Sequence, residues 1–155
     1  MNNVSDAPNK KIYFNSKYLH GIDEKRRLQI PAKWRPEAEG VEFTVILWPK
    51  HQAGICLRVL PPEKLEKLVA EIEAMPNSDP RKDVLRRVVG GNSEQVQLDK
   101  AGRICLPEDM ARAAGLKNEA KLVGMFEQFE IWEPGRYQIV EAADGVHQLK
   151  AFEMM

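Results

Sequence analysis

The amino-acid sequence has 155 residues, which suits one domain or two small halves that share a core. Hydrophobic residues make up 43% and charged residues 30%, and 23 basic residues balance 23 acidic ones, so the formal net charge is zero. This balance is ordinary for a globular chain and excludes a uniformly basic nucleic-acid binder, so any basic surface has to be local. No apolar run is long enough to span a membrane and the polar N-terminus lacks the core of a signal peptide, so we expect a cytoplasmic protein.

The first half of the chain predicts two short strands, a short helix and a hairpin. Residues 1–11 carry no apolar pattern and are expected to be flexible. A strand over 17–22 leads to Asp23, where a turn begins, and Leu28 and Ile30 then alternate as in a second strand. The remaining elements of this half are a short helix opened by a proline and the two strands of a hairpin, over 32–38, 41–47 and 55–60.

Two helices follow and link this half to the next. The first, over 62–75, carries one apolar face that we expect to be buried, and so does the second, which starts from a cap formed by Asp79 and Pro80. Gly90 and Gly91 end the second helix. The residues predicted to point inward are Leu65, Leu68, Val69 and Ile72 in the first helix and Val84, Leu85, Val88 and Val89 in the second.

The second half of the chain repeats the first. Residues 99–107 share an Asp, an Arg and a Pro with residues 23–31 at a separation of 76, and residues 129–134 resemble residues 57–62 at a separation of 72. Two matches in the same order indicate a duplicated unit, whose first copy is expected to hold four extra residues in the loop 49–54. The corresponding elements are strands over 95–98 and 104–106, a helix over 107–114 that Gly115 ends, and a hairpin of 120–125 with 129–132.

The end of the chain predicts one more helix. It starts at Pro134 and carries Tyr137 and Val140, whereas the pattern is weak from about residue 142, where we expect a loose tail. The chain thus divides into a flexible N-terminus, a first repeat, linking helices, a second repeat and a C-terminal helix with its tail, over 1–11, 17–63, 64–91, 93–136 and 137–155.

Each repeat carries the motif Asp-x-x-x-Arg in its turn. A leading Asp accepts hydrogen bonds from the backbone N–H groups of a turn, so Asp23 and Asp99, together with Gly102, are expected to shape the two turns. Arg27 and Arg103 follow, where a planar guanidinium can reach a phosphate or the edge of a guanine. The alternative is that each Arg pairs with its own Asp and only locks the turn.

The basic residues are concentrated around the first motif. Residues 17–35 contain six basic and two acidic side chains, a formal charge of +4, whereas residues 127–155 contain two basic and six acidic ones, a formal charge of −4. Such a local positive surface is typical of a protein that binds a phosphate backbone.

No cluster of reactive side chains indicates an enzyme. The three histidines are scattered, and neither a Gly-rich phosphate loop nor a nucleophilic Ser motif occurs. Cys56 and Cys105 lie in apolar runs and are expected to be buried thiols in a reducing compartment. We therefore predict no catalytic, cofactor-binding or metal-binding residue, no cofactor and no small-molecule substrate.

From about residue 14 to residue 137 the chain resembles the MraZ family of bacterial transcriptional regulators. The resemblance rests on the runs from His20 to Arg35, Asp99 to Arg103, Gly115 to Leu116, Leu122 to Gly124 and Phe129 to Trp132. The family usually has Gly before the Arg of the first motif, where this chain has Arg26. If the turn requires a positive φ there, Arg26 is strained, and alternatively it adds a phosphate contact.

The resemblance implies an α+β fold in which two tandem AbrB-like units form a swapped-hairpin β-barrel with peripheral helices. It implies a ring-shaped homo-oligomer that binds short direct repeats of double-stranded DNA in a promoter, typically that of its own operon of division and cell-wall genes. A nucleoid-associated regulator of transcription would then make its DNA contacts through Lys25, Arg26, Arg27, Lys100 and Arg103. The alternative is an AbrB-like protein-interaction module of antitoxin type, without promoter-specific regulation.

Overall fold

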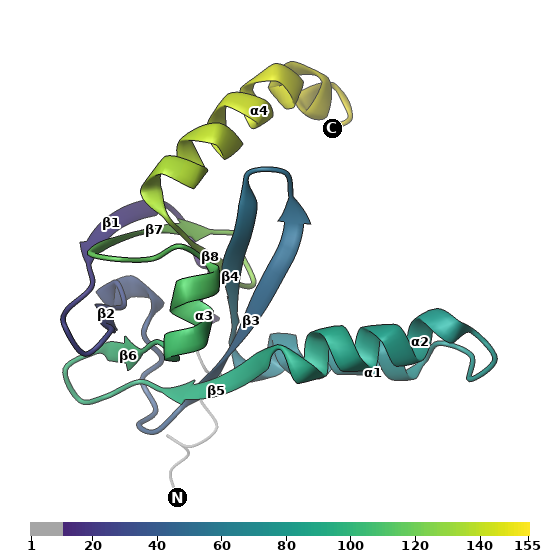
Figure 1. Ribbon diagram of the computed structural model, residues 1–155, viewed down its shortest axis with the longest axis horizontal. Coiled ribbons are helices and arrows are strands. Elements are labelled where there is room, and N and C mark those ends of the chain that lie inside the picture. The colour runs from purple at the N-terminus through teal and green to yellow at the C-terminus, as the bar shows by residue number, and fades with distance from the viewer. Residues whose placement is uncertain (1–10) are drawn as a thin grey trace, which may run out of the picture.

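A computed structural model describes residues 11–155 (Figure 1). Except for Lys11, the segment that we expect to be flexible lies outside the described residues. In chain order the elements are β1 (Lys17–Gly21), β2 (Arg27–Gln29), η2 (Ala32–Trp34), β3 (Glu42–His51), β4 (Gly54–Leu60), α1 (Pro62–Glu73), α2 (Pro80–Leu85), η3 (Arg86–Gly90), β5 (Ser93–Gln97), β6 (Arg103–Cys105), α3 (Glu108–Ala113), β7 (Glu119–Gly124), β8 (Phe129–Trp132) and α4 (Pro134–Glu153).

The strands form two antiparallel sheets, which makes the fold α+β. One sheet has six strands in the order β1-β7-β8-β4-β3-β5, and the other is a ribbon of β2 and β6. Among the described residues β1 and β5 are edge strands, so the six-stranded sheet is open and is not a closed barrel. The closed barrel is absent because the two three-residue strands pair with each other instead of extending the larger sheet.

The strands of the two halves pair with one another. The first strand of each half pairs with a hairpin strand of the other half, β1 with β7 and β5 with β3. In the ribbon Arg27 lies opposite Cys105 and Gln29 lies opposite Arg103, so the register is unchanged when residues 76 apart are exchanged. Because the ribbon is antiparallel, the two turns that precede β2 and β6 lie at its opposite ends.

One hydrophobic core lies between the ribbon and the six-stranded sheet. Leu28 and Ile104 face each other on the inner side of the ribbon and are fully buried. Trp34 packs beside them, with its ring centroid 4.8 Å from that of Phe129, and its indole N–H donates to the Asn15 carbonyl at 3.0 Å. Burying such side chains contributes about 1.5–3 kcal/mol each, so the inner side of the ribbon is fixed firmly by the core.

The linking helices differ from the sequence prediction. The hairpin of α1 with α2 and η3 projects from the body (Figure 1), so most of its apolar residues do not reach the core. Ile72 is buried, whereas four residues predicted to point inward are exposed: Val69, Val84, Leu85 and Val88. The start of the second helix is as predicted, since the Asp79 carboxylate accepts from the Arg81 backbone N–H at 2.9 Å.

Two further segments differ in form from the prediction. The first hairpin is longer than the second, as expected, but its extra residues extend β3 to His51 and start β4 at Gly54 and do not form a loop over 49–54. The tail expected from residue 142 is helical, because α4 runs without a break to Glu153. The Glu133 carboxylate caps this helix by accepting from the backbone N–H groups of Gly135 and Arg136, and good helix formers then sustain it.

Candidate nucleic-acid interface

The first turn is built around one carboxylate. Asp23 Oδ1 accepts from the backbone N–H groups of Lys25 at 3.0 Å and Arg27 at 2.8 Å. The Asp23 carbonyl accepts from the Arg26 backbone N–H at 2.9 Å. Arg27 then donates its Nε–H to Asp23 Oδ2 at 2.6 Å, so the side chain that opens the turn also holds the arginine that closes it.

The second turn has the same hydrogen bonds. Asp99 Oδ1 accepts from the backbone N–H groups of Ala101 and Arg103, both at 2.9 Å, and the Asp99 carbonyl accepts from Gly102 at 3.0 Å. Arg103 Nε donates to Asp99 Oδ2 at 3.1 Å. The backbone N–H bonds, above all those of Arg27 and Arg103, hold the pKa of both Asp carboxyls below their ordinary value, so both are ionised at neutral pH.

Each Arg is bonded to its own Asp and still reaches solvent. The side chains of Arg27 and Arg103 are 36% and 32% exposed. Both use Nε for the carboxylate, and within residues 11–155 their terminal Nη atoms donate no hydrogen bond. The Nη fork can therefore bind a phosphate or a guanine while the Nε bond fixes its direction.

The ribbon brings the two arginines together. Arg27 and Arg103 are diagonal neighbours in the ladder, where Cβ atoms stand roughly 7–8 Å apart. They share the outer side of the ribbon with Gln29 and Cys105, because the residues between them, Leu28 and Ile104, point into the core. We call this outer side, with the two turns at its ends, the ribbon face.

Two residues of the ribbon face are not singled out by the sequence. Gln29 donates its side-chain amide to the Ala101 carbonyl at 2.9 Å, and Cys105 Sγ lies 3.3 Å from the Lys25 carbonyl. Each side chain thus ties one strand to the opposite turn. Cys105 is exposed, so its expected burial is wrong: in a three-residue strand only the middle residue faces the core. The alternation of inward and outward residues in each short strand, Arg27 to Gln29 and Arg103 to Cys105, is the signal that could have revealed both positions.

The predicted lysines lie at the edges of this surface. Lys25 and Lys100 are exposed, one in each turn. With Arg27 and Arg103 they give the ribbon face four cations that point to solvent around two carboxylates, which are already occupied by hydrogen bonds.

Arg26 occupies a position that favours glycine. Its φ is +61°, and that of the corresponding Gly102 is +83°. Its guanidinium does not extend into solvent alone, because Nε donates to the Leu106 carbonyl at 3.0 Å. The first turn therefore keeps the conformation of the second despite its side chain.

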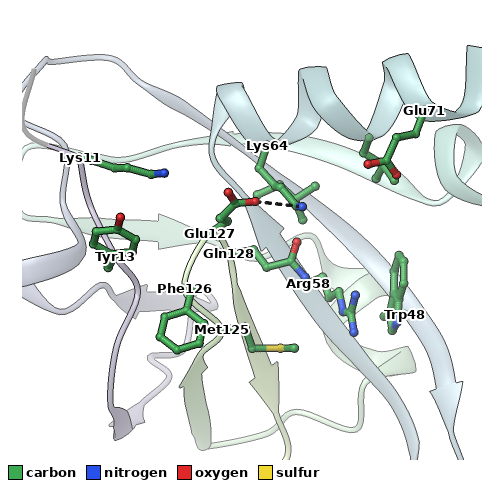
Figure 2. Close-up of a pocket in the computed structure, with 12 residues that line it drawn as sticks. Lys11, Tyr13, Trp48, Arg58, Lys64, Glu71, Met125, Phe126, Glu127 and Gln128 are labelled. Carbon is green, nitrogen blue, oxygen red and sulfur yellow. Dashed lines mark hydrogen bonds and ion pairs between the residues drawn. The ribbon is translucent and has the colours of Figure 1, made fainter. Parts of the chain in front are cut away.

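A hollow of about 780 Å³ lies elsewhere, beside α1 and the loop between β7 and β8 (Figure 2). Several of its charged groups are engaged within the chain: Lys64 pairs with Glu127 at 3.2 Å, and the Arg58 guanidinium lies 4.0 Å from the centre of the Trp48 ring. In the part of the chain that the structure describes, no three His, Cys, Asp or Glu side chains gather as a metal site would require. Burial raises the pKa of the Cys56 thiol, which disfavours the reactive thiolate.

Across residues 11–155, no helix combines the length and the apolar character that a membrane span requires.

Comparisons with known proteins agree on one family. The family model for the MraZ protein, described as antitoxin-like, matches residues 90–152. A transcriptional regulator MraZ from Rickettsia rickettsii is 32% identical over 81% of this chain and 84% of its own length. Proteins of the same name from Thermomicrobium roseum and Burkholderia cenocepacia are 34% and 35% identical, over 78% and 79% of this chain and 82% and 83% of their own lengths.

Proposed function

Since this chain belongs to the MraZ family of transcriptional regulators, we propose that it binds double-stranded DNA in a sequence-specific manner through the ribbon face. The observation that carries the proposal is the pair of equivalent turns, which hold Arg27 and Arg103 by Nε on one side of a two-stranded ribbon. The proposed activity contains no catalytic step.

The dimensions of the ribbon suit the major groove. That groove is about 12 Å wide and admits a two-stranded β-ribbon, and arginine is the side chain that most often reads guanine there. Arg27 and Arg103 would reach base edges with their Nη atoms, while Lys25 and Lys100 would bind phosphates on either side. The sites would be short direct repeats in a promoter, among them that of its own operon of division and cell-wall genes, and the protein would act at the nucleoid in the cytoplasm.

We propose that the protein works as a ring-shaped homo-oligomer. Two apolar surfaces project from different parts of the body (Figure 1): the end of α4 and the hairpin of α1 with α2. Val146 and Leu149, on α4, are 77% and 78% exposed, and a groove of about 490 Å³ along the hairpin is lined by Leu65, Val69 and Leu85. Packing α4 of one copy into this groove of the next is a head-to-tail contact, which closes a ring or continues as a filament.

An arrangement of two AbrB-like units with swapped hairpins, around an open sheet and not a closed barrel, belongs to the same proposal. The mutual pairing of β1 with β7 and β5 with β3 supports it, as does the shared core between the ribbon and the larger sheet. We propose the same division of the chain into repeats over 17–63 and 93–136, with linking helices over 64–91.

A gel-shift titration with the DNA upstream of the protein's own gene tests the proposal. The wild type should shift a duplex with several repeats more strongly than a duplex with one, because linked sites raise the effective concentration. Arg27→Ala and Arg103→Ala should each weaken binding by about tenfold, in keeping with 1–3 kcal/mol for a base contact. Arg112→Ala is the matched control, since Arg112 is exposed and binds only residues of its own helix, Glu108 and Asp109. Equal affinity of all four proteins would contradict the proposal.

A second candidate function is an interaction module of antitoxin type. The antitoxin-like description of the matched family model favours it. In that case the exposed end of α4 would bind a different protein instead of a second copy. Light scattering of the purified chain separates the two, because only self-association gives a homo-oligomer in the absence of a partner.

A further inference from the structure

Ile30 and Leu106 hold equivalent places at the ends of the two ribbon strands. The backbone N–H of Ile30 donates to the Gly102 carbonyl at 2.8 Å, and that of Leu106, 76 residues later, donates to the Arg26 carbonyl at 2.9 Å. Each residue thus fastens its own strand to the turn of the other half.

The carbonyls of Ile30 and Leu106 each accept a hydrogen bond from a guanidinium, but the two arginines come from positions that do not correspond in the repeat. Arg35 Nε donates to the Ile30 carbonyl at 2.8 Å, beside the second turn. Arg26 Nε donates to the Leu106 carbonyl at 3.0 Å, beside the first turn. One arginine lies within its turn, whereas the other follows η2.

The second turn has room for one of the two side chains in the observed arrangement. A Cβ atom at Gly102 would overlap the Arg35 guanidinium, so Arg35 would have to leave its position beside the Ile30 carbonyl. The residue that corresponds to Arg35 in the second half is Ala111, which leaves that space to Arg26. The first turn combines Arg26 with Ala111, and the second combines Gly102 with Arg35.

We propose that Arg26 and Arg35 are equivalent positioning residues, each of which holds one DNA-contacting turn against the ribbon with a single guanidinium. The glycine of the second turn makes room for Arg35, and the arginine of the first turn replaces the guanidinium that Ala111 lacks. The statement that these turns contact DNA rests on the proposed function, whereas the equivalence of Arg26 and Arg35 does not.

Gly102→Arg combined with Arg35→Ala gives the second turn the same pair of residue types as the first. Gly102→Arg alone should lower the melting temperature, because two guanidinium groups then compete for the space beside the Ile30 carbonyl. Arg35→Ala in the same chain should recover much of that loss, so the two effects are not additive. Gly102→Ala with and without Arg35→Ala is the milder version, for use if Gly102→Arg does not fold. Additive effects in both pairs would overturn the equivalence of Arg26 and Arg35.

DNA binding distinguishes a positioning role from a phosphate contact. Arg35→Ala should weaken binding of the upstream duplex by about tenfold, since it loses the Nε–H bond to the Ile30 carbonyl. The slope of log affinity against log salt should stay that of the wild type. A slope that falls by about one would show a phosphate contact instead.

The two measurements can fail separately. If the wild type does not bind the duplex, the proposed function is wrong, and the melting temperatures still decide whether Arg26 and Arg35 are equivalent. If the wild type binds and Arg35→Ala, measured at a temperature where it is fully folded, binds equally well, the positioning role is wrong.

Discussion

Arg58 and Glu130 lie opposite each other where the two halves meet, at the centre of the pairing between β4 and β8, with Arg58 Nε 3.1 Å from Glu130 Oε2. Both side chains are largely buried, at 23% and 11% exposure. Glu130 also accepts from the indole N–H of Trp132 at 2.9 Å, so one carboxylate serves two donors.

Removing this carboxylate should destabilise the protein. Glu130→Ala leaves the Arg58 guanidinium and the Trp132 N–H without their acceptor, and we expect a loss of about 2–4 kcal/mol in the free energy of unfolding. Glu127→Ala is the control, because Glu127 pairs with Lys64 and Lys67 at the surface and its removal should destabilise the protein much less. Urea unfolding measures both, and equal losses would show that the central pair is no stronger than a surface pair.

At position 26 glycine should give a more stable protein than alanine, the reverse of the usual order of stability. Arg26→Gly and Arg26→Ala both lose the bond to the Leu106 carbonyl, but only alanine keeps a side chain at φ +61°. The Gly variant should therefore be more stable than the Ala variant by about 1 kcal/mol. Thermal unfolding of the two proteins checks this, and a more stable Ala variant would mean that the turn has no left-handed requirement.

Lysines and arginines of the ribbon face should differ in their response to salt. Lys25→Ala and Lys100→Ala should weaken binding to all duplexes alike and lower the salt slope by about 0.9 per phosphate contact. Arg27→Ala and Arg103→Ala should reduce the preference for the promoter repeat over unrelated DNA. Fluorescence anisotropy at several salt concentrations measures both quantities. Lysine variants that lose only specificity would reverse the assignment.

The two turns should be sensitive to acid. Because the pKa of Asp23 and Asp99 is lower in the folded protein than in the unfolded chain, the ionised carboxylates stabilise the fold above their unfolded pKa, and this stabilisation is lost as the pH falls through the folded pKa. NMR titration should give midpoints below 3.8 for both residues. Midpoints of 3.8 or more would contradict the hydrogen bonding described for the turns.

The exposed end of α4 should be required for assembly. Val146→Asp and Leu149→Asp should lower the mass measured by light scattering to that of a smaller species without loss of helical content, because both side chains face solvent in the single chain. Gln148→Asp adds the same charge at a neighbouring exposed position and should leave the mass unchanged. A wild-type protein that is already a monomer at micromolar concentration would contradict the ring.

Features fixed by neighbouring residues could be predicted from the sequence, and features fixed by distant ones could not. The cap at Asp79 and the helix end at Gly115, whose φ is +70°, depend on a few adjacent residues. The exposure of Val84 depends on whether anything packs against a projecting hairpin, which its periodicity does not reveal. Of the candidate site, Asp23 to Arg27 could be singled out from the repeat, whereas Arg35 could not, because its partner position lies in the other half of the chain.

The mutual pairing of the two halves has a consequence for synthesis on the ribosome. Lys17 lies opposite Val123, so β1 has no partner strand until β7 has been translated. The first half leaves the exit tunnel with the edges of β1 and β3 unpaired, and such edges are prone to associate with other chains. Its folding must therefore wait for the second half, through contacts that are far apart in the sequence and form slowly. Nascent chains in neighbouring positions on a polysome would meet in this state, and the same strand pairing that completes one molecule could then join two.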